Sequence, residues 1–172
     1  FGLHSAALFA QLTGVKTIAA TGGNYTSLQA AIADLNNVGV GVGGVTFNVP
    51  AGWTETFTST TAGRITPSGT LANPIVFQKS GSGANPLITA YAIGTGTIDY
   101  VFGVEGARNY ITFDGIDVQA NSSSANATQM VEFGYFINGA MYQGNTNNTI
   151  KNCTITLNNA NTNLNCGVYQ VS

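Results

Sequence analysis

The chain has 172 residues, a length that suits one domain. Only 7% of them are charged, against about 25% in an ordinary soluble domain, and the net charge is -2. Phosphate-mediated binding of nucleic acid needs a basic surface, and so does charge-driven binding to a membrane surface. The composition therefore excludes a nucleic-acid-binding protein of this kind and argues against a protein held at a membrane surface by charge. Gly, Thr and Asn, at 22, 22 and 19 residues, replace the missing charges and suit an extracellular, β-rich scaffold.

Residues 1–11 are mostly apolar and small, a pattern like the end of a secretory signal peptide. Two interpretations are open: the segment is a signal-peptide remnant, or it is an apolar N-terminal arm that packs on a neighbouring subunit. No run of about 18 apolar residues occurs elsewhere, so the sequence predicts no transmembrane helix. We expect the protein to be secreted or to lie on the outer cell surface.

Residues 12–44 are predicted to form an N-terminal strand, at 15–20, and one helix, at 25–37. Thr26 or Ser27 can serve as the helix N-cap. Four apolar residues recur at helical spacing in this segment: Leu28, Ala31, Ile32 and Leu35. A single apolar stripe needs a surface to cover, so we expect the helix to cap the open end of a β structure.

Residues 45–172 show short alternating strands separated by Gly, Asn, Pro and Ser, which argues for an all-β winding. Strands are predicted at 45–49, 54–58, 73–78, 86–90, 100–104, 109–118, 130–137, 149–157 and 166–171. Two segments are predicted to be outward loops, 121–128 and 139–147. The last strand has no closing cap after it, so we expect the coils to continue beyond residue 172.

An internal repeat favours a β-solenoid over a β-sandwich. Residues 113–118 match residues 150–155 at a spacing of 37, as apolar, polar, Gly or Asn, apolar, polar, apolar. Gly115 and Asn152 hold the position of a tight corner, where a positive φ suits these two residue types. The matching pattern predicts coils that stack along one axis, about 4.8 Å apart, with like side chains above one another.

Several segments resemble a family of secreted surface proteins of the Bacteroidetes type. They are 12–18, 24–32, 44–49, 55–57, 73–79, 110–116 and 150–155. The resemblance implies a right-handed parallel β-helix of the pectin-lyase-like type with one short N-terminal capping helix. It also implies export by a type IX secretion system, and thus secretion machinery as a partner. One departure is Asn148, which stands where the match with Ile111 predicts an inward apolar residue.

The fold-level analogy raises the alternative of a polysaccharide lyase or glycoside hydrolase with a site on the flank of the β-helix. Such enzymes need paired carboxyls, or an acidic cluster for calcium with a nearby base. Asp114, Asp117 and Arg108 would carry this chemistry, in a charge cluster that includes Glu105 and that Glu132 and Lys151 can reach.

Each of these residues also has a structural interpretation. Asp114 precedes a corner glycine, where Asp commonly bonds its own turn. Asp117 suits a solvated face, and Arg108 suits pairing with Glu105. The single histidine, His4, lies in the leader-like segment, so we expect no zinc site. The sequence predicts no cofactor, apart from calcium under the lyase alternative.

Other functions rest on aromatic residues and cysteines. Six aromatic residues are predicted on the surface, where they offer stacking platforms for sugar rings: Trp53, Tyr91, Tyr100, Tyr135, Tyr142 and Tyr169. Among these, Trp53 and Tyr142 are the candidates for glycan contact. Cys153 and Cys166 are expected to point inward, either as two small buried thiols or as a bridge between stacked strands.

The preferred function is that of a non-enzymatic structural or adhesive module. Its expected partners are extracellular glycans, surface proteins or copies of itself, with no nucleic acid. Self-association into an oligomer or filament would use residues 1–11 and the uncapped C-terminal end.

Overall fold

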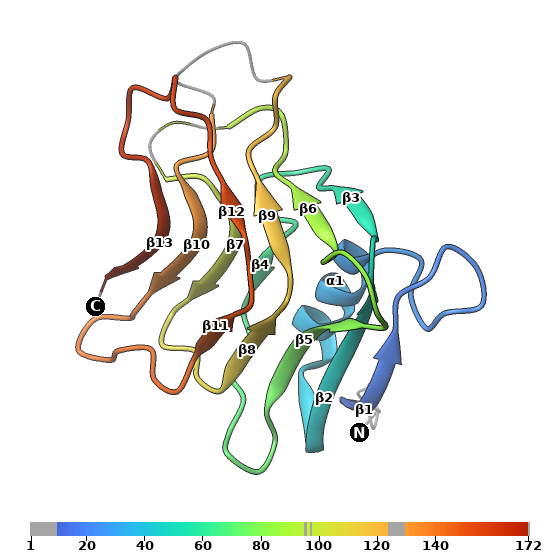
Figure 1. Cartoon of the computed structure of the whole chain (residues 1–172). Coiled ribbons are helices and arrows are strands. Elements are labelled where there is room, and N and C mark those ends of the chain that lie inside the picture. The colour runs from blue at the N-terminus through green and yellow to red at the C-terminus, as the bar shows by residue number, and fades with distance from the viewer. Residues whose placement is uncertain (1–9, 95, 97, 124–129, 172) are drawn as a thin grey trace, which may run out of the picture.

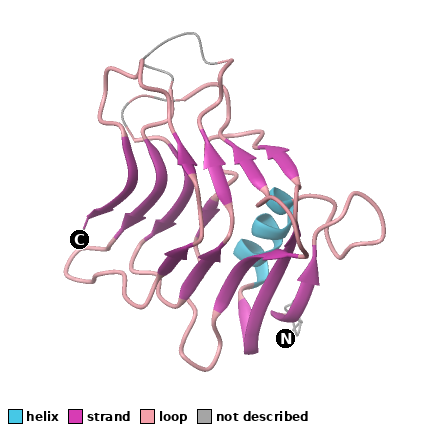
Figure 2. Cartoon of the chain, viewed as in Figure 1, coloured by secondary structure: helices cyan, strands magenta, loops and turns pink. Residues whose placement is uncertain are grey.

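The computed structural model describes residues 10–94, 96, 98–123 and 130–171. It is a parallel β-solenoid built from three sheets, with a single short helix in the described part (Figures 1 and 2). The strand order is β1-β2-β5-β8-β11 in the first sheet, β3-β6-β9-β12 in the second and β4-β7-β10-β13 in the third. Every pairing between these strands is parallel, so the predicted all-β solenoid is confirmed and the sandwich is excluded.

In coils 2–5 the chain passes through the three sheets in turn, with one strand in each, whereas coil 1 has one strand and the helix. Coil 1 holds β1 (Leu12–Thr17) and α1 (Leu28–Val38). Coil 2 holds β2 (Val40–Pro50), β3 (Thr54–Thr56) and β4 (Arg64–Ile65). Coil 3 holds β5 (Ile75–Ser80), β6 (Leu87–Thr89) and β7 (Tyr100–Glu105). Coil 4 holds β8 (Ile111–Asp114), β9 (Asp117–Gln119) and β10 (Phe133–Asn138). Coil 5 holds β11 (Thr149–Lys151), β12 (Ile155–Thr156) and β13 (Cys166–Val171).

The register stacks like side chains into columns inside the solenoid. Phe47 pairs with Phe77 and Phe77 with Phe113, and their rings stack at centroid distances of 4.9 and 5.2 Å. Ile150 follows Phe113 in coil 5, which confirms the 37-residue repeat. Tyr135, predicted on the surface, is instead buried beside Phe113, because the hydroxyl donates to the carbonyl of Ile116 at 2.7 Å.

The corner predicted from the repeat is confirmed. Gly115 and Asn152 occupy it in consecutive coils with φ of 68° and 56°. The predicted strand at 109–118 is therefore two strands that meet at this corner, β8 and β9. Predictions elsewhere miss the two-residue strand β4, which is too short to show alternation.

The glycine-rich stretch before residue 45 is strand in the structure, where the sequence predicts none, because β2 begins at Val40. Gly44 has a φ of 78°, and a Cβ atom there would lie 2.5 Å from the carbonyl oxygen of Pro74. Only glycine fits this close approach between coils 2 and 3.

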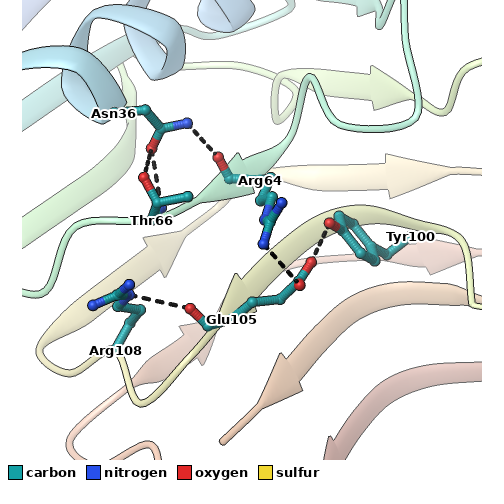
Figure 3. A network of polar contacts seen from close by, with 6 residues as sticks. All are labelled: Asn36, Arg64, Thr66, Tyr100, Glu105 and Arg108. Atoms are coloured by element: carbon teal, nitrogen blue, oxygen red, sulfur yellow. Dashed lines mark hydrogen bonds and ion pairs between the residues drawn. The ribbon is translucent and has the colours of Figure 1, made fainter. Parts of the chain in front are cut away.

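Helix α1 caps the N-terminal end of the solenoid, as expected. Ser27 is the N-cap, and the apolar stripe of the helix is buried. Coil 1 has no strand in the second and third sheets, and side chains of α1 make the hydrogen bonds that such strands would make. The Nδ2 atom of Asn36 donates to the carbonyl of Arg64 at 2.7 Å, while Oδ1 accepts from the backbone N–H of Thr66 at 3.0 Å (Figure 3). The Oε1 atom of Gln29 accepts from the N–H of Thr58 at 3.2 Å.

An acid occupies one core column at the same end. In the second sheet Glu55 pairs with Ile88, Ile88 with Val118 and Val118 with Ile155. The Glu55 carboxylate accepts from the N–H groups of Leu28 and Gln29 at 2.7 and 2.9 Å. These first-turn amides have no acceptor inside the helix, so Glu55 supplies one. The positive end of the helix dipole in turn stabilises the negative charge of Glu55.

Among the described residues, no helix covers coil 5 in the way that α1 covers coil 2. The inward residues of coil 5, Ile150, Cys153 and Ile155, are half-buried, whereas the coil 4 residues below them are fully buried. Cys153 and Cys166 are free thiols and half-buried, so neither alternative predicted for them, two buried thiols or a bridge, describes the structure.

If Asn36 substitutes for a strand, Asn36→Asp should destabilise the fold. A carboxylate would face the carbonyl of Arg64 and lose the donor, at a cost of about 1–3 kcal/mol. Asn37→Asp is the matched control, since Asn37 is exposed, adjacent and subject to the same charge change near the helix C-terminus. Urea denaturation of both variants measures the difference. Equal losses of unfolding free energy would show that the pairing with β4 contributes nothing.

Candidate functional site

The carboxylates of this chain hold the fold together. The seven acids are Asp34, Glu55, Asp99, Glu105, Asp114, Asp117 and Glu132. Each accepts at least one hydrogen bond from another group of the chain. Glu132 is fully buried and accepts from the N–H of Asp99 and from the side-chain amides of Asn161 and Asn163. It therefore lies away from the charge cluster in which the sequence predicted it.

Asp114 and Asp117 lie in one polar cluster at the corner between the first and second sheets. Asp114 forms an ion pair with Lys151 at 3.2 Å and accepts from Nδ2 of Asn152 at 2.8 Å. Asp117 accepts from Nδ2 of Asn85 at 2.8 Å and from the N–H of Thr154 at 2.7 Å. Both acids thus tie neighbouring coils together.

The hydrogen bond from Asn152 and the Lys151 ammonium hold the pKa of Asp114 below its ordinary value of 3.8. A carboxyl with a lowered pKa is a poor proton donor at neutral pH, although it can still serve as a base or nucleophile.

Arg108, the third residue of the enzymatic hypothesis, lies at the other end of β8. It precedes that strand, whereas Asp114 ends it. Its Nε atom donates to the carbonyl of Glu105 at 3.1 Å, and its backbone N–H donates to Oδ1 of Asn145 at 2.6 Å. The structure thus groups Asp114 with Asp117, and Arg108 with the charges of the third sheet.

Trp53 and Tyr142, the predicted glycan contacts, differ in their surroundings. Trp53 is half-buried against the core, and its Nε1 atom donates to the Glu55 carboxylate at 3.0 Å. Tyr142 is 98% exposed in the loop that follows β10, beside the bridge between Ala140 and Gln143. Trp53 therefore supports the helix cap, while Tyr142 is open to a ligand.

A second group of aromatic residues lies outside the core, on the outer face of the third sheet. Tyr100 stacks on Phe136 at 5.5 Å, and Phe136 on Tyr169 at 6.0 Å, with ring planes within 7° of parallel. Phe133 packs beside Phe136 and Tyr169 at 5.2 and 4.8 Å. We call Tyr100, Phe133, Phe136 and Tyr169 the outer aromatic stack.

Gly103 makes this stack possible. It pairs with Phe136, which pairs with Tyr169, so these three positions form one column on the outer face. A Cβ atom at Gly103 would lie 2.4 Å from the ring of Tyr100. The missing side chain therefore leaves the place into which the Tyr100 ring turns.

A charged network adjoins the stack on the side of coil 2 (Figure 3). The Tyr100 hydroxyl donates to the Glu105 carboxylate, which forms an ion pair with Arg64 at 3.4 Å. Burial and the adjacent Glu105 carboxylate raise the pKa of the Tyr100 hydroxyl. Tyr100 therefore stays protonated and donates, and the charge of Glu105 is balanced by Arg64.

A groove of about 310 Å³ adjoins the stack on the side of coil 5. Its walls are mostly apolar: Ile98, Phe133, Phe136, Asn138, Leu164, Tyr169 and Val171. Within the described residues, the side-chain amide of Asn138 makes no hydrogen bond. The groove thus combines ring faces, aliphatic walls and one amide free to bind a ligand.

Phe133 and Phe136 are the residues of this face that the sequence analysis does not find. Alternation assigns every second residue of β10 to the core, yet residues 133–137 carry apolar or small side chains throughout. In a strand of a solenoid, an unbroken apolar run indicates that both faces are covered. That signal was available from the sequence.

A hollow of about 360 Å³ lies between α1 and the segment after β3. Gln29 and Asn36 on its wall already bond to Thr58 and Thr66. Among the described residues, no three His, Cys, Asp or Glu side chains gather as metal ligands, and His4 lies outside that range. Calcium binding, which the lyase alternative includes, stays a prediction.

Comparison with known proteins finds no family model, no curated protein and no solved structure that matches the chain. The parallel β-solenoid is thus shown by the structure. The pectin-lyase-like relationship, the Bacteroidetes type and type IX export stay predictions. In the described part of the chain, no helix is long and apolar enough to cross a membrane.

The corner cluster predicts a pH effect. Asn152→Gly keeps a residue suited to the positive φ but removes the amide, so the pKa of Asp114 should rise toward 3.8. A lowered folded-state pKa stabilises the fold above the unfolded value and loses that effect as pH falls through the folded value. The stability difference between wild type and variant should therefore be full at neutral pH and shrink below pH 3.8.

Two measurements check this effect: NMR titration of the Asp114 carboxyl and urea denaturation at several pH values. Asn147→Gly is the control, because Asn147 also has a positive φ, 56°, and makes no bond to Asp114. An unchanged Asp114 pKa in Asn152→Gly would contradict the assigned cause.

Proposed function

We propose that this protein is a non-catalytic structural and adhesive module that binds neutral glycan chains on the outer face of its third sheet. The observation that carries the proposal is the outer aromatic stack, which ends in a groove beside Tyr169. We also propose that it acts outside the cell, because a low-charge surface rich in Thr and Asn suits that setting.

Tyr169 is the proposed stacking platform. The ring is the last of the stack, so one of its faces meets Phe136 and no described ring covers the other. The apolar face of a pyranose packs on such a ring, while hydroxyls need donors and acceptors at its edge. Asn138 provides both from its unpaired amide.

Charge balance favours a neutral ligand. Glu105, the acid of this face, is paired with Arg64 and accepts from Tyr100. An acidic polysaccharide would need a surplus of cations, and the chain has five Lys and Arg against seven Asp and Glu. A neutral glycan requires no such surplus.

The alternative function, a polysaccharide lyase or glycoside hydrolase, depends on the corner of Asp114 and Asp117. A hydrolase needs one carboxyl that stays protonated to serve as the acid. The hydrogen bond and ion pair of Asp114 favour its charged form, and Asp117 is occupied by two donors. Among the described residues, no carboxylate lines the groove on the third sheet. These facts favour binding over cleavage.

A glycan array with neutral and acidic chains tests the proposal, followed by calorimetry on the best ligand. We expect binding to a neutral chain and a loss of affinity of about tenfold in Tyr169→Ala, equivalent to 1.4 kcal/mol. Tyr142→Ala is the matched control, since it removes an exposed tyrosine that does not line the groove. Loss of binding in Tyr142→Ala alone would move the site to that loop.

A cleavage assay on the same chains separates the two functions. New chain ends that appear with wild type and vanish in Asp114→Ala would establish the enzyme and reject the proposal. Failure to bind any glycan on the array would reject it as well.

A further inference from the structure

The groove on the third sheet offers a ligand few hydrogen bonds. Of its seven lining residues, only Asn138 and Tyr169 carry a polar side-chain group. The others are aliphatic or phenylalanine: Ile98, Phe133, Phe136, Leu164 and Val171. An unsubstituted hexose carries a hydroxyl on most of its ring carbons, and each hydroxyl that loses water without gaining a partner costs free energy. The groove therefore suits a sugar that carries an apolar group of its own.

Asn138 and Val171 lie side by side at one end of the groove. Asn138 is the last residue of β10, and Val171 is its partner on β13. Phe136 and Tyr169 form the pair two positions earlier, so all four side chains point to the outer face. Val171 is 39% exposed, so its methyl groups are open to a ligand. An amide and an aliphatic side chain thus stand together beside the Tyr169 ring.

An acetamido group matches this pair of side chains. Its carbonyl oxygen and its methyl group are bonded to the same carbon, so they reach two neighbouring side chains at once. Nδ2 of Asn138 can donate to the carbonyl, while Oδ1 stays free to accept from a ring hydroxyl. The methyl group then packs on Val171, which removes apolar surface from water. A hydroxyl in the same place would use the amide and leave the aliphatic wall without a contact.

The opposite end of the groove is apolar as well. Ile98, Phe133 and Leu164 lie at or before the first residues of β7, β10 and β13, whereas Asn138 and Val171 lie at the ends of their strands. Ile98 and Leu164 are more than half exposed. Apolar surface at both ends, with the ring of Tyr169 between them, suits a chain that carries an acetyl group on successive sugars.

The charges near the groove favour the acetylated form of an amino sugar. A free amino sugar carries an ammonium group, and among the residues that the structure describes no carboxylate lines the groove. Glu105, the partner of Asn138 on β7, is occupied by Arg64 and Tyr100. A sugar acid would need a cation, and no described lysine or arginine lines the groove. Acetylation removes the charge of the amine, so an N-acetylated sugar needs no counterion here.

We propose that the glycan bound in the groove contains N-acetylhexosamine residues. A sugar ring packs on Tyr169, Nδ2 of Asn138 donates to the acetyl carbonyl, and the acetyl methyl group packs on Val171. This inference rests on the proposed function, since it names the class of sugar for the same site. It adds a preference among neutral glycans that ring stacking alone does not give, because glucose and N-acetylglucosamine share the apolar ring face.

Calorimetry with two trimers, fully N-acetylated chitotriose and cellotriose, tests the inference. The trimers have the same linkage and differ in one group on each sugar, which is acetamido in the first and hydroxyl in the second. We expect chitotriose to bind at least about tenfold more tightly. In saturation-transfer NMR, the acetyl methyl protons should be among the most strongly saturated protons of the ligand.

Two variants locate the acetamido group. Val171→Thr replaces a methyl by a hydroxyl of similar size, so it should weaken chitotriose binding about fourfold and leave cellotriose binding unchanged. Val168→Thr is the matched control, because Val168 lies in the same strand, pairs with Tyr135 and does not line the groove. Asn138→Leu removes the donor and should reduce the preference for chitotriose. Circular dichroism checks that all three variants are folded.

The outcomes separate this inference from the proposed function. Equal affinity for the two trimers, or binding of another neutral glycan without chitotriose, would overturn the inference alone. A preference for chitotriose that survives both Val171→Thr and Asn138→Leu would overturn it too, since the acetamido group would then lie elsewhere. Failure of every glycan to bind would reject the proposed function, and the inference with it.

Discussion

Parallel pairing between successive coils is the constraint on which the rest of this structure depends. Each strand bonds to the strands before and after it in its sheet, so the register fixes which side chains stand above one another. The stacked rings of Phe47, Phe77 and Phe113 follow directly from that register. The same constraint leaves unpaired edges only at the two ends of the solenoid and at its outermost strands. At the N-terminal end, where no strand precedes β3 and β4, some other partner is therefore needed.

The N-terminal end shows how side chains can be that partner. Asn36 presents a donor and an acceptor to β4, as a neighbouring strand would. Glu55 stands in a column of aliphatic residues, where its charge would be costly without partners. It finds them in the first amides of α1, which lack partners of their own. The carboxylate thus gives the helix amides an acceptor, and the amides give the buried charge its donors. This explains why a charged residue stands at an inward position.

The sequence predicts the features that repeat and misses those that depend on a neighbouring coil. The corner at Gly115 and Asn152 is recognisable because both residues tolerate the required φ. The helix is recognisable from its own spacing. By contrast, Tyr135 is placed inside and Tyr100 outside by their surroundings, Phe113 in one case and Gly103 in the other. Alternation within one strand cannot indicate which face is covered when both faces are apolar, as in β10.

The few acidic residues of this chain are committed to its structure. The seven acids all accept hydrogen bonds that hold coils, corners or the helix in place, so chemistry that moves protons would compete with structure. On the third sheet, the uncharged groups that remain uncommitted are the last ring of the outer aromatic stack and the amide of Asn138. Ring stacking and amide hydrogen bonds are the contacts that these groups offer to the proposed glycan ligand. Because neither contact uses a charged group at neutral pH, the proposed glycan binding should vary little with salt.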